Sequence, residues 1–286
     1  MTSIQALDVF VQERPRLFAL AYGFLGSRAD ASDAVQETWI RWQGREVGDV
    51  RDPAAWLTTV TARLALDRLR SARVRRETYP GTWLPEPVVD APSAEQAVLQ
   101  RSELSVAFLF LLERLGPEER AAFVLREVFD HSYRDISETL EKSEASCRQL
   151  VTRARERVRQ DRVRAPVDHT EFERLLRRYV DALASGDERG LLELIAPGAV
   201  LYGDGGGKAL SIVNPLHGPE RIVKFLMGLR RKYRGQYELR PTNVNGWAGF
   251  LVVLGGQVRG VSAYDISGGK IYGIYHVVNP DKLQPA

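Results

Sequence analysis

The sequence feature that most constrains the fold is a change of hydrophobic periodicity near Pro166. Before it, apolar residues recur every three or four positions, which is the spacing of a buried helix stripe. From Ala199 onward they fall in short runs separated by turns such as Gly255-Gly256, which is typical of antiparallel strands. These two patterns need different packing layers, so the 286-residue chain is predicted to be multidomain, with an all-α part followed by an α+β domain.

Three helices are predicted in the first 76 residues. They cover residues 9–25, 30–42 and 53–76, and residues 44–53 form a loop rich in Gly, Asp and Pro. The tryptophans Trp39, Trp42 and Trp56 are interpreted as core residues. The opposite face of the second helix is polar and carries Asp33, Gln36, Glu37 and Arg41.

Residues 78–93 have the composition of a linker, with four prolines and a glycine. This linker contains the run Trp83-Leu84-Pro85-Glu86-Pro87. Because burying an indole is more favourable than leaving it in water, we expect the run to dock on another part of the protein.

A helix-turn-helix is predicted at residues 133–158. A short helix over Tyr133–Leu140 is followed by a tight turn and by Ser143, which can cap a second helix that reaches about Val158. Cys147, Val151 and Ala154 are predicted to face inward. The outward face carries Glu144, Ser146, Arg148, Gln149, Thr152 and Arg153. Arg and Gln on such a face can read guanine and adenine edges in a major groove.

The net charge is +3, but residues 1–165 are neutral as a whole, with 25 Lys and Arg against 25 Asp and Glu; their basic charge is concentrated in two arcs, at residues 63–76 and 148–164. Two arcs on an otherwise neutral body indicate two surfaces that contact phosphates. Two solvated helix faces are the alternative, and the charges alone do not separate these interpretations.

Cysteine content and hydropathy limit the cell compartment and the kinds of site that the chain can form. Cys147 is the single cysteine, so internal disulfides and Cys-rich metal sites are excluded. The run Val106–Leu112 covers only about a third of the roughly 20 residues that a membrane span needs, and we find no secretory signal. The sequence therefore predicts a cytoplasmic protein with no membrane partner, metal or cofactor.

Taken in order, the first two regions resemble an extracytoplasmic-function (ECF) sigma factor of bacterial RNA polymerase. The resemblance covers about 160 residues, and no single string carries it alone. The strings are Asp33-Ala34-Val35-Gln36-Glu37-Thr38-Trp39, Trp56-Leu57 through Leu66-Asp67-Arg68-Leu69-Arg70, and Ser132-Tyr133-Arg134-Asp135-Ile136-Ser137 leading to Ala145-Ser146-Cys147-Arg148-Gln149-Leu150.

The resemblance implies two sigma domains with separate tasks. Residues 1–77 would be sigma domain 2, residues 78–100 the linker, and residues 101–163 sigma domain 4, which would also meet the polymerase flap. Asp33, Gln36, Glu37 and Arg41 would bind the clamp helices of the largest polymerase subunit. Arg63, Arg68, Arg70 and Arg73 would contact the melted −10 element, and Arg148, Gln149, Thr152 and Arg153 would read the −35 element.

Three further strings look like the subgroup with a fused C-terminal SnoaL-like domain, here residues 168–286. They are Trp83-Leu84-Pro85-Glu86-Pro87, Asp204-Gly205-Gly206-Gly207-Lys208 and Asn279-Pro280-Asp281-Lys282-Leu283. We hypothesise that this domain packs on the linker through Trp83, Leu84, Pro85 and the Asp204–Lys208 run, and so controls the placement of the two DNA-reading modules.

Some SnoaL-like proteins are cyclases that use an Asp/His pair. The titratable candidates here are Asp204, Asp265, His217 and His276, with Tyr202, Trp247, Tyr264 and Tyr272 as lining residues. The glycine run lacks the ending and spacing of a Walker loop, so it is interpreted as a turn. We therefore predict a regulatory domain without catalytic residues, and a small-molecule ligand in it stays open.

Two other functions are compatible with parts of the sequence. A stand-alone helix-turn-helix regulator with a ligand-binding tail would bind duplex DNA tightly without polymerase. An isomerase or cyclase with a DNA-binding appendage would show turnover that depends on Asp204 or His276. Both leave residues 33–39 and the loop at 44–53 unexplained.

Overall fold

The computed structural model describes residues 3–43, 45, 50–89, 93–160 and 168–283. Parts of the predicted 44–53 loop, the end of the second basic arc and the boundary at Pro166 lie outside these ranges. The chain forms two compact units. The first unit consists of Met1–Thr78, Pro92–Leu104 and Phe108–Arg162, and the second of Tyr79–Ala91, Ser105–Ala107 and Val163–Ala286. Most of the predicted linker therefore belongs to the second unit.

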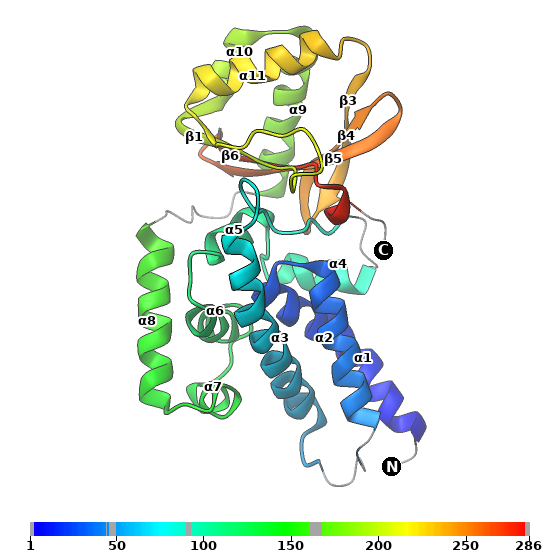
Figure 1. Ribbon diagram of the computed structural model, residues 1–286, viewed down its shortest axis with the longest axis vertical. Helices are drawn as coiled ribbons and strands as arrows, with labels where there is room; N and C mark the ends of the chain where they lie inside the picture. The colour runs from blue at the N-terminus through cyan, green and yellow to red at the C-terminus, as the bar shows by residue number, and fades with distance from the viewer. Residues whose placement is uncertain (1–2, 44, 46–49, 90–92, 161–167, 284–286) are drawn as a thin grey trace. The chain divides into compact units, whose positions relative to one another are not determined.

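The first unit begins with the three predicted helices, α1 (Ser3–Leu25), α2 (Arg28–Gln43) and α3 (Pro53–Glu77) (Figure 1). The Asp52 side chain caps α3 by accepting a hydrogen bond from the Ala55 amide at 3.0 Å, and Pro53 occupies the first turn. Trp42 is fully buried, and its indole N–H donates to the Ala6 carbonyl at 2.9 Å. Trp39 packs against Phe10 with 4.8 Å between ring centroids.

The rest of the first unit is also helical. Its helices are α4 (Ser93–Arg101), α5 (Val106–Leu112), α6 (Pro117–Phe123), a π-helical turn (Val124–Val128), α7 (Tyr133–Leu140) and α8 (Glu144–Gln160). The helix-turn-helix was predicted almost to the residue: Ser132 caps α7, and Glu141 adopts a left-handed φ of 55° that ends it. Cys147 is fully buried, as predicted.

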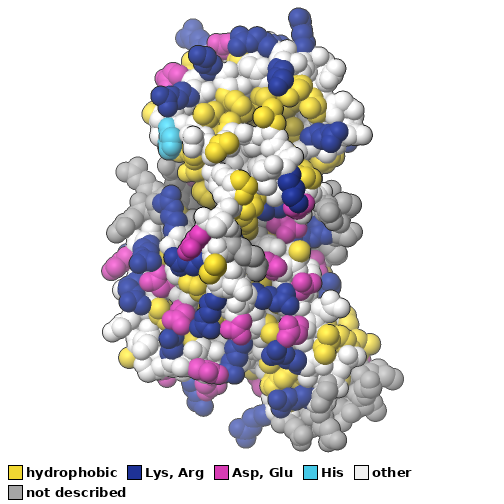
Figure 2. All heavy atoms as spheres, in the orientation of Figure 1, with side chains coloured by type: hydrophobic (Ala, Val, Ile, Leu, Met, Phe, Trp, Pro, Cys, Tyr) yellow, Lys and Arg dark blue, Asp and Glu magenta, His cyan; other side chains and the backbone are white. Residues whose placement is uncertain are grey.

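The first unit contains two helical sets, α1–α3 and α5–α8. They pack on each other, because α3 contacts both α6 and α7. Their close approach is visible at Gly23 of α1, where an added Cβ would lie 3.1 Å from the Val124 side chain. Figure 2 shows that basic and acidic side chains are interspersed over the visible face of these helices.

The second unit holds a six-stranded sheet in the order β2-β1-β6-β5-β4-β3, with helices on one face (Figure 1). The helices are α9 (His169–Ser185), α10 (Glu188–Leu194) and α11 (Pro219–Lys232). The strands are β1 (Ile195–Asp204), β2 (Leu216–His217), β3 (Tyr237–Val244), β4 (Trp247–Leu254), β5 (Gln257–Ser267) and β6 (Lys270–Val277). The core lies between helices and sheet and includes Tyr179, Phe250 and Tyr264.

The expected antiparallel meander is right for β3 to β6 but not for β1, which pairs in parallel with β6. The sheet is therefore mixed. A parallel pair needs a long crossover, and here α11 and the three strands β3 to β5 lie between the partners in the chain.

None of the helices in the described part of the chain combines the length and apolar character that a bilayer span requires.

Candidate functional sites

The polar face of α2 is tied to α3 by an ion-pair network. Asp33 and Gln36 are exposed and Glu37 is half-buried. Arg68 of α3 reaches Asp33 at 3.4 Å and Glu37 at 3.3 Å, while Arg41 pairs with Glu37 at 2.7 Å. Gln36 stands in the same face with no hydrogen-bond partner among the described residues, so it is free to contact another molecule.

The arginines predicted to contact the −10 element are mostly engaged inside the first unit. Arg63 donates to the carbonyls of Glu138 at 2.7 Å and Thr139 at 3.1 Å, at the C-terminal end of α7 where helix carbonyls lack intrahelical partners. It also pairs with Glu141 at 3.2 Å. Arg63 therefore fastens α3 to the helix-turn-helix. The other three arginines of this set have different surroundings. Arg68 pairs with Asp33 and Glu37 of α2, Arg70 pairs with Asp67 and Glu118 at 3.1 Å each, and Arg73 is exposed.

The residues predicted to read the −35 element lie together on the exposed face of α8. Arg148, Gln149, Thr152 and Arg153 are all exposed, and Cys147, Val151 and Ala154 on the opposite face are buried. This arrangement follows from the helical period, since positions four apart share a face.

Two contacts orient the arginines of this face. Arg148 pairs with Glu144 at 2.7 Å, and its guanidinium lies 4.8 Å from the Tyr133 ring centroid. Arg153 lies 3.4 Å from Glu119 of α6, which also accepts from Arg157 at 2.6 Å. This face of α8 is thus partly ordered by ion pairs with Glu144 and Glu119 and by the Tyr133 ring.

In the second unit, Asp204 lies at the centre of a cluster that holds the linker. Its Oδ1 accepts from the Tyr79 hydroxyl at 2.6 Å, and its Oδ2 accepts from the Leu84 amide at 2.9 Å and the Lys282 ammonium at 2.7 Å. We call these four residues the linker clamp. Asp204 is fully buried and the Lys282 side chain is 10% exposed, so the charges are paired and hydrogen-bonded, as burial requires.

Aromatic rings complete the linker clamp. The Lys282 ammonium lies 4.1 Å from the Trp83 ring centroid and also donates to the Leu84 carbonyl. Burial, together with the hydrogen bond to Asp204, raises the pKa of Tyr79 well above its usual value, so its hydroxyl remains a donor to the carboxylate. The docking expected from Trp83 takes place at the end of β1, with Leu84 fully buried.

A second contact joins the linker to the β3–β4 turn. The Val88 amide donates to the Asn245 side-chain oxygen at 2.9 Å, and the Asn245 amide donates to the Val88 carbonyl at 2.9 Å. Val89 forms a bridge with Val244. Residues 79–89 are therefore held at both ends, by the linker clamp and by Asn245. Pro85 lies between these two contacts.

The glycine run after Asp204 is a tight turn. Gly206 has a φ of +60°, and an added Cβ would lie 2.3 Å from the Asn279 side chain. Gly205 has no room beside the Ala209 carbonyl and Gly207 lies close to Pro80. Lys208 pairs with Asp281 at 2.5 Å. The run thus brings the 204–208 and 279–282 segments together.

Two of the titratable candidates for catalysis, Asp204 and His276, do not face each other. His276 lies opposite Gly203 in the sheet, so its side chain and that of Asp204 are on different faces. The His276 Nδ1 is 2.8 Å from the Ser262 hydroxyl, and burial lowers the pKa of His276 to about 4. Of the predicted lining residues, Tyr264 is buried in the core.

Sequence reasoning missed the roles of Tyr79, Asn245 and Lys282. Only Lys282 stood in a string that had been noted, Asn279 to Leu283. A lone Tyr or Asn in a loop carries no signal of a partner more than 100 positions away.

Comparison with known proteins identifies the family. Residues 9–75 match Sigma-70 region 2, and residues 105–158 match Sigma-70, region 4. The ECF RNA polymerase sigma factor SigJ of Mycobacterium tuberculosis is 38% identical over 286 residues, which cover 94% of this chain and 90% of that protein. The chain belongs to the ECF RNA polymerase sigma factors.

Other relatives extend the family match over nearly the whole chain. The probable ECF sigma factor SigI of Mycobacterium tuberculosis is 34% identical over 275 residues, covering 95% of this chain and 92% of that protein. The crystal structure of the ECF sigma factor SigJ superimposes with a TM-score of 0.80 at 36% identity, over 96% of this chain and 97% of that one. The predicted family and fold class, two helical sigma domains and a SnoaL-like α+β domain, are confirmed. Sigma factors are transcription regulators that partner with core RNA polymerase and promoter DNA.

Proposed function

We propose that this ECF sigma factor is regulated by its own SnoaL-like domain, which holds the linker between the two DNA-reading modules. The single observation that carries the proposal is the linker clamp, in which one fully buried carboxylate, Asp204, accepts from a side chain and a backbone amide of the linker. A domain present only for stability would not need to place a buried charge against the segment that connects the modules.

The contacts of the first unit support the same proposal. Arg63 joins α3 to the end of α7, and Arg70 joins α3 to Glu118 at the start of α6. The two helical sets must separate to reach the −10 and −35 elements together. A linker held at residues 79–89 opposes that separation. If these residues were released, they could extend and span the larger distance between the two helical sets. Core polymerase would shift the balance by binding the separated arrangement better.

Transcription from a cognate promoter with purified core polymerase tests the regulation. Asp204→Ala in the full chain removes the acceptor of the linker clamp, and we expect promoter output at limiting sigma factor to rise several-fold. The matched control is Asp181→Ala, which makes the same change at an exposed position of α9. Equal output from wild type and both variants would remove the regulatory proposal.

We further propose that the polar face of α2 binds the clamp helices of the largest polymerase subunit, and that the α5–α8 set contacts the flap. Because Asp33 and Glu37 also hold Arg68, reversing their charges would disturb α3 as well. Gln36→Lys is the sharper probe, since Gln36 is exposed and Arg68 keeps its partners. Its matched control is Gln12→Lys on the exposed side of α1. Co-purification with core polymerase should weaken for the first variant and not for the second.

For promoter DNA, we propose that Arg148, Gln149, Thr152 and Arg153 read the −35 element and that the arc from Arg63 to Arg73 contacts the melted −10 strand. Since Arg63 and Arg70 are engaged with the helix-turn-helix set, the second contact would form only after separation. We propose no catalytic activity, because His276 and Asp204 lie on different faces of the sheet. We also propose a cytoplasmic location, where polymerase and chromosome meet.

A further inference from the structure

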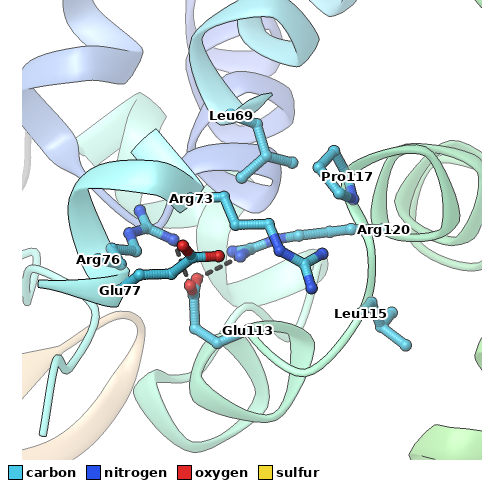
Figure 3. A pocket seen from close by; sticks show the side chains of 8 residues that line it. All are labelled: Leu69, Arg73, Arg76, Glu77, Glu113, Leu115, Pro117 and Arg120. Atoms are coloured by element: carbon cyan, nitrogen blue, oxygen red, sulfur yellow. Dashed lines mark hydrogen bonds and ion pairs between the residues drawn. The ribbon is translucent and has the colours of Figure 1, made fainter. Parts of the chain in front are cut away.

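A pocket of about 230 Å³ in the first unit lies between α3 and the segment that joins α5 to α6 (Figure 3). Its polar lining consists of three guanidinium groups, from Arg73, Arg76 and Arg120, and two carboxylates, from Glu77 and Glu113. The two sides come from different helical sets, so the pocket exists only while α3 packs on α6.

The lining carries one more positive charge than negative, since three guanidinium groups face two carboxylates. Arg76 and Arg120 both bind the same carboxylate, Glu113, and their side chains are 14% and 1% exposed. Each arginine also donates to a backbone carbonyl of α1, Arg120 to Gly23 at 3.0 Å and Arg76 to Leu25. Burial lowers the pKa of Arg76, and the neighbouring charge of Arg120 acts in the same direction to a smaller extent.

One donor in this cluster is left without an acceptor. The Nη2 of Arg120 is buried and has no hydrogen-bond partner among the described residues. A buried unsatisfied donor is unfavourable, and the more so on a charged group. Arg73 extends over the same pocket from the exposed side of α3, and the Glu77 side chain points toward those of Arg120 and Glu113 (Figure 3).

We propose that this pocket binds the phosphate group of a small soluble compound. Guanidinium groups match the oxygens of a phosphate in pairs; the exposed Arg73 fork supplies such a pair, and the buried Arg120, with its unpaired donor, belongs to the same lining. The inference goes beyond the proposed function, since it assigns a ligand to the sigma domains themselves.

Binding would have a defined consequence for the conformation. Because Arg73 belongs to α3 and Arg120 to α6, a phosphate between them stabilises the packed arrangement of the two helical sets. A ligand shifts an equilibrium only as far as it prefers one state, and this pocket is absent from the separated state. The ligand therefore opposes promoter binding.

Isothermal titration calorimetry of the full chain tests the site with three probes at constant ionic strength: inorganic phosphate, pyrophosphate and adenosine triphosphate. We expect saturable binding of at least one probe. Arg73→Gln should weaken it about tenfold or more, because a hydrogen bond to a charged group is lost, and Arg73→Lys should restore part of it. Arg73 is exposed, so these variants should fold normally. The matched control is Arg134→Gln, an exposed arginine of α7 that should leave binding unchanged.

The outcomes separate the ligand sources as well. Equal binding of inorganic phosphate and the two larger probes assigns the site to free phosphate, and tighter binding of the larger probes assigns it to a phosphorylated organic compound. The proposal is overturned if wild type binds none of the probes at millimolar concentration, or if Arg73→Gln and Arg134→Gln bind them as wild type does. In thermal unfolding, the probe that binds should raise the midpoint of wild type and of Arg134→Gln more than that of Arg73→Gln.

Discussion

The hydrogen bond from the Leu84 amide to Asp204 makes the linker clamp measurable at one backbone position. Asp204 is fully buried and Lys282 nearly so, and removing one partner of a buried ion pair costs about 3–5 kcal/mol. In Asp204→Ala, the Leu84 amide and the Lys282 ammonium both lose their acceptor. We therefore expect the free energy of opening of the linker to fall by about 3 kcal/mol.

Hydrogen exchange followed by mass spectrometry reports this change directly. A loss of about 3 kcal/mol corresponds to exchange that is roughly a hundredfold faster in peptides covering residues 79–89. Peptides from β5 and the α8 helix should exchange as in wild type, which shows that the variant is folded. Asp181→Ala, exposed on α9, should leave the linker peptides unchanged. If the linker peptides of Asp204→Ala exchanged within about threefold of wild type, the reasoning on the buried charge would be refuted.

Three further changes test other parts of the structure. Arg148→Ala should lower affinity for a −35 duplex about tenfold and affinity for a scrambled duplex much less, as measured by fluorescence anisotropy; an equal loss on both would mean that Arg148 does not read bases. The unfolded chain takes up a proton on His276 near pH 6.5 and the folded one only near pH 4, so the free energy of unfolding should fall by about 1 kcal/mol per pH unit as pH drops between these values. Denaturation across this range should show a flatter profile for His276→Gln, and an unchanged slope would contradict the assignment. Gly206→Ala should lower the unfolding midpoint more than Gly235→Ala, because both have positive φ but only the first Cβ would meet Asn279.

The elements that sequence predicts well are those with local causes. The start of α3 at Pro53 follows from its Asp52 cap, and α7 and α8 follow from capping serines and a helical stripe. The outward set on α8 could be predicted because a helix of known phase has one buried face. The docking of the linker was also predicted, from a tryptophan that needs burial.

The rest depends on contacts between distant positions. The parallel pairing of β1 with β6 joins residues more than 70 positions apart, and β2 has only two residues, too few for a pattern. The engagement of Arg63 with α7 was not predictable, since an arginine on a polar face looks the same whether it contacts DNA, water or a helix end. The same applies to Arg120, which is charged in sequence and fully buried in the fold.

Glu119 competes with nucleic acid for two arginines of α8, the helix that we propose reads the −35 element. Its carboxylate pairs with Arg153 and Arg157, two side chains that could otherwise contact the phosphates of a groove. On the proposed function, DNA would have to displace this carboxylate, and only contacts more favourable than the two ion pairs would yield a net gain. In the free protein, the carboxylate holds the two arginine side chains in place. The same carboxylate would disfavour weak binding of nonspecific duplexes.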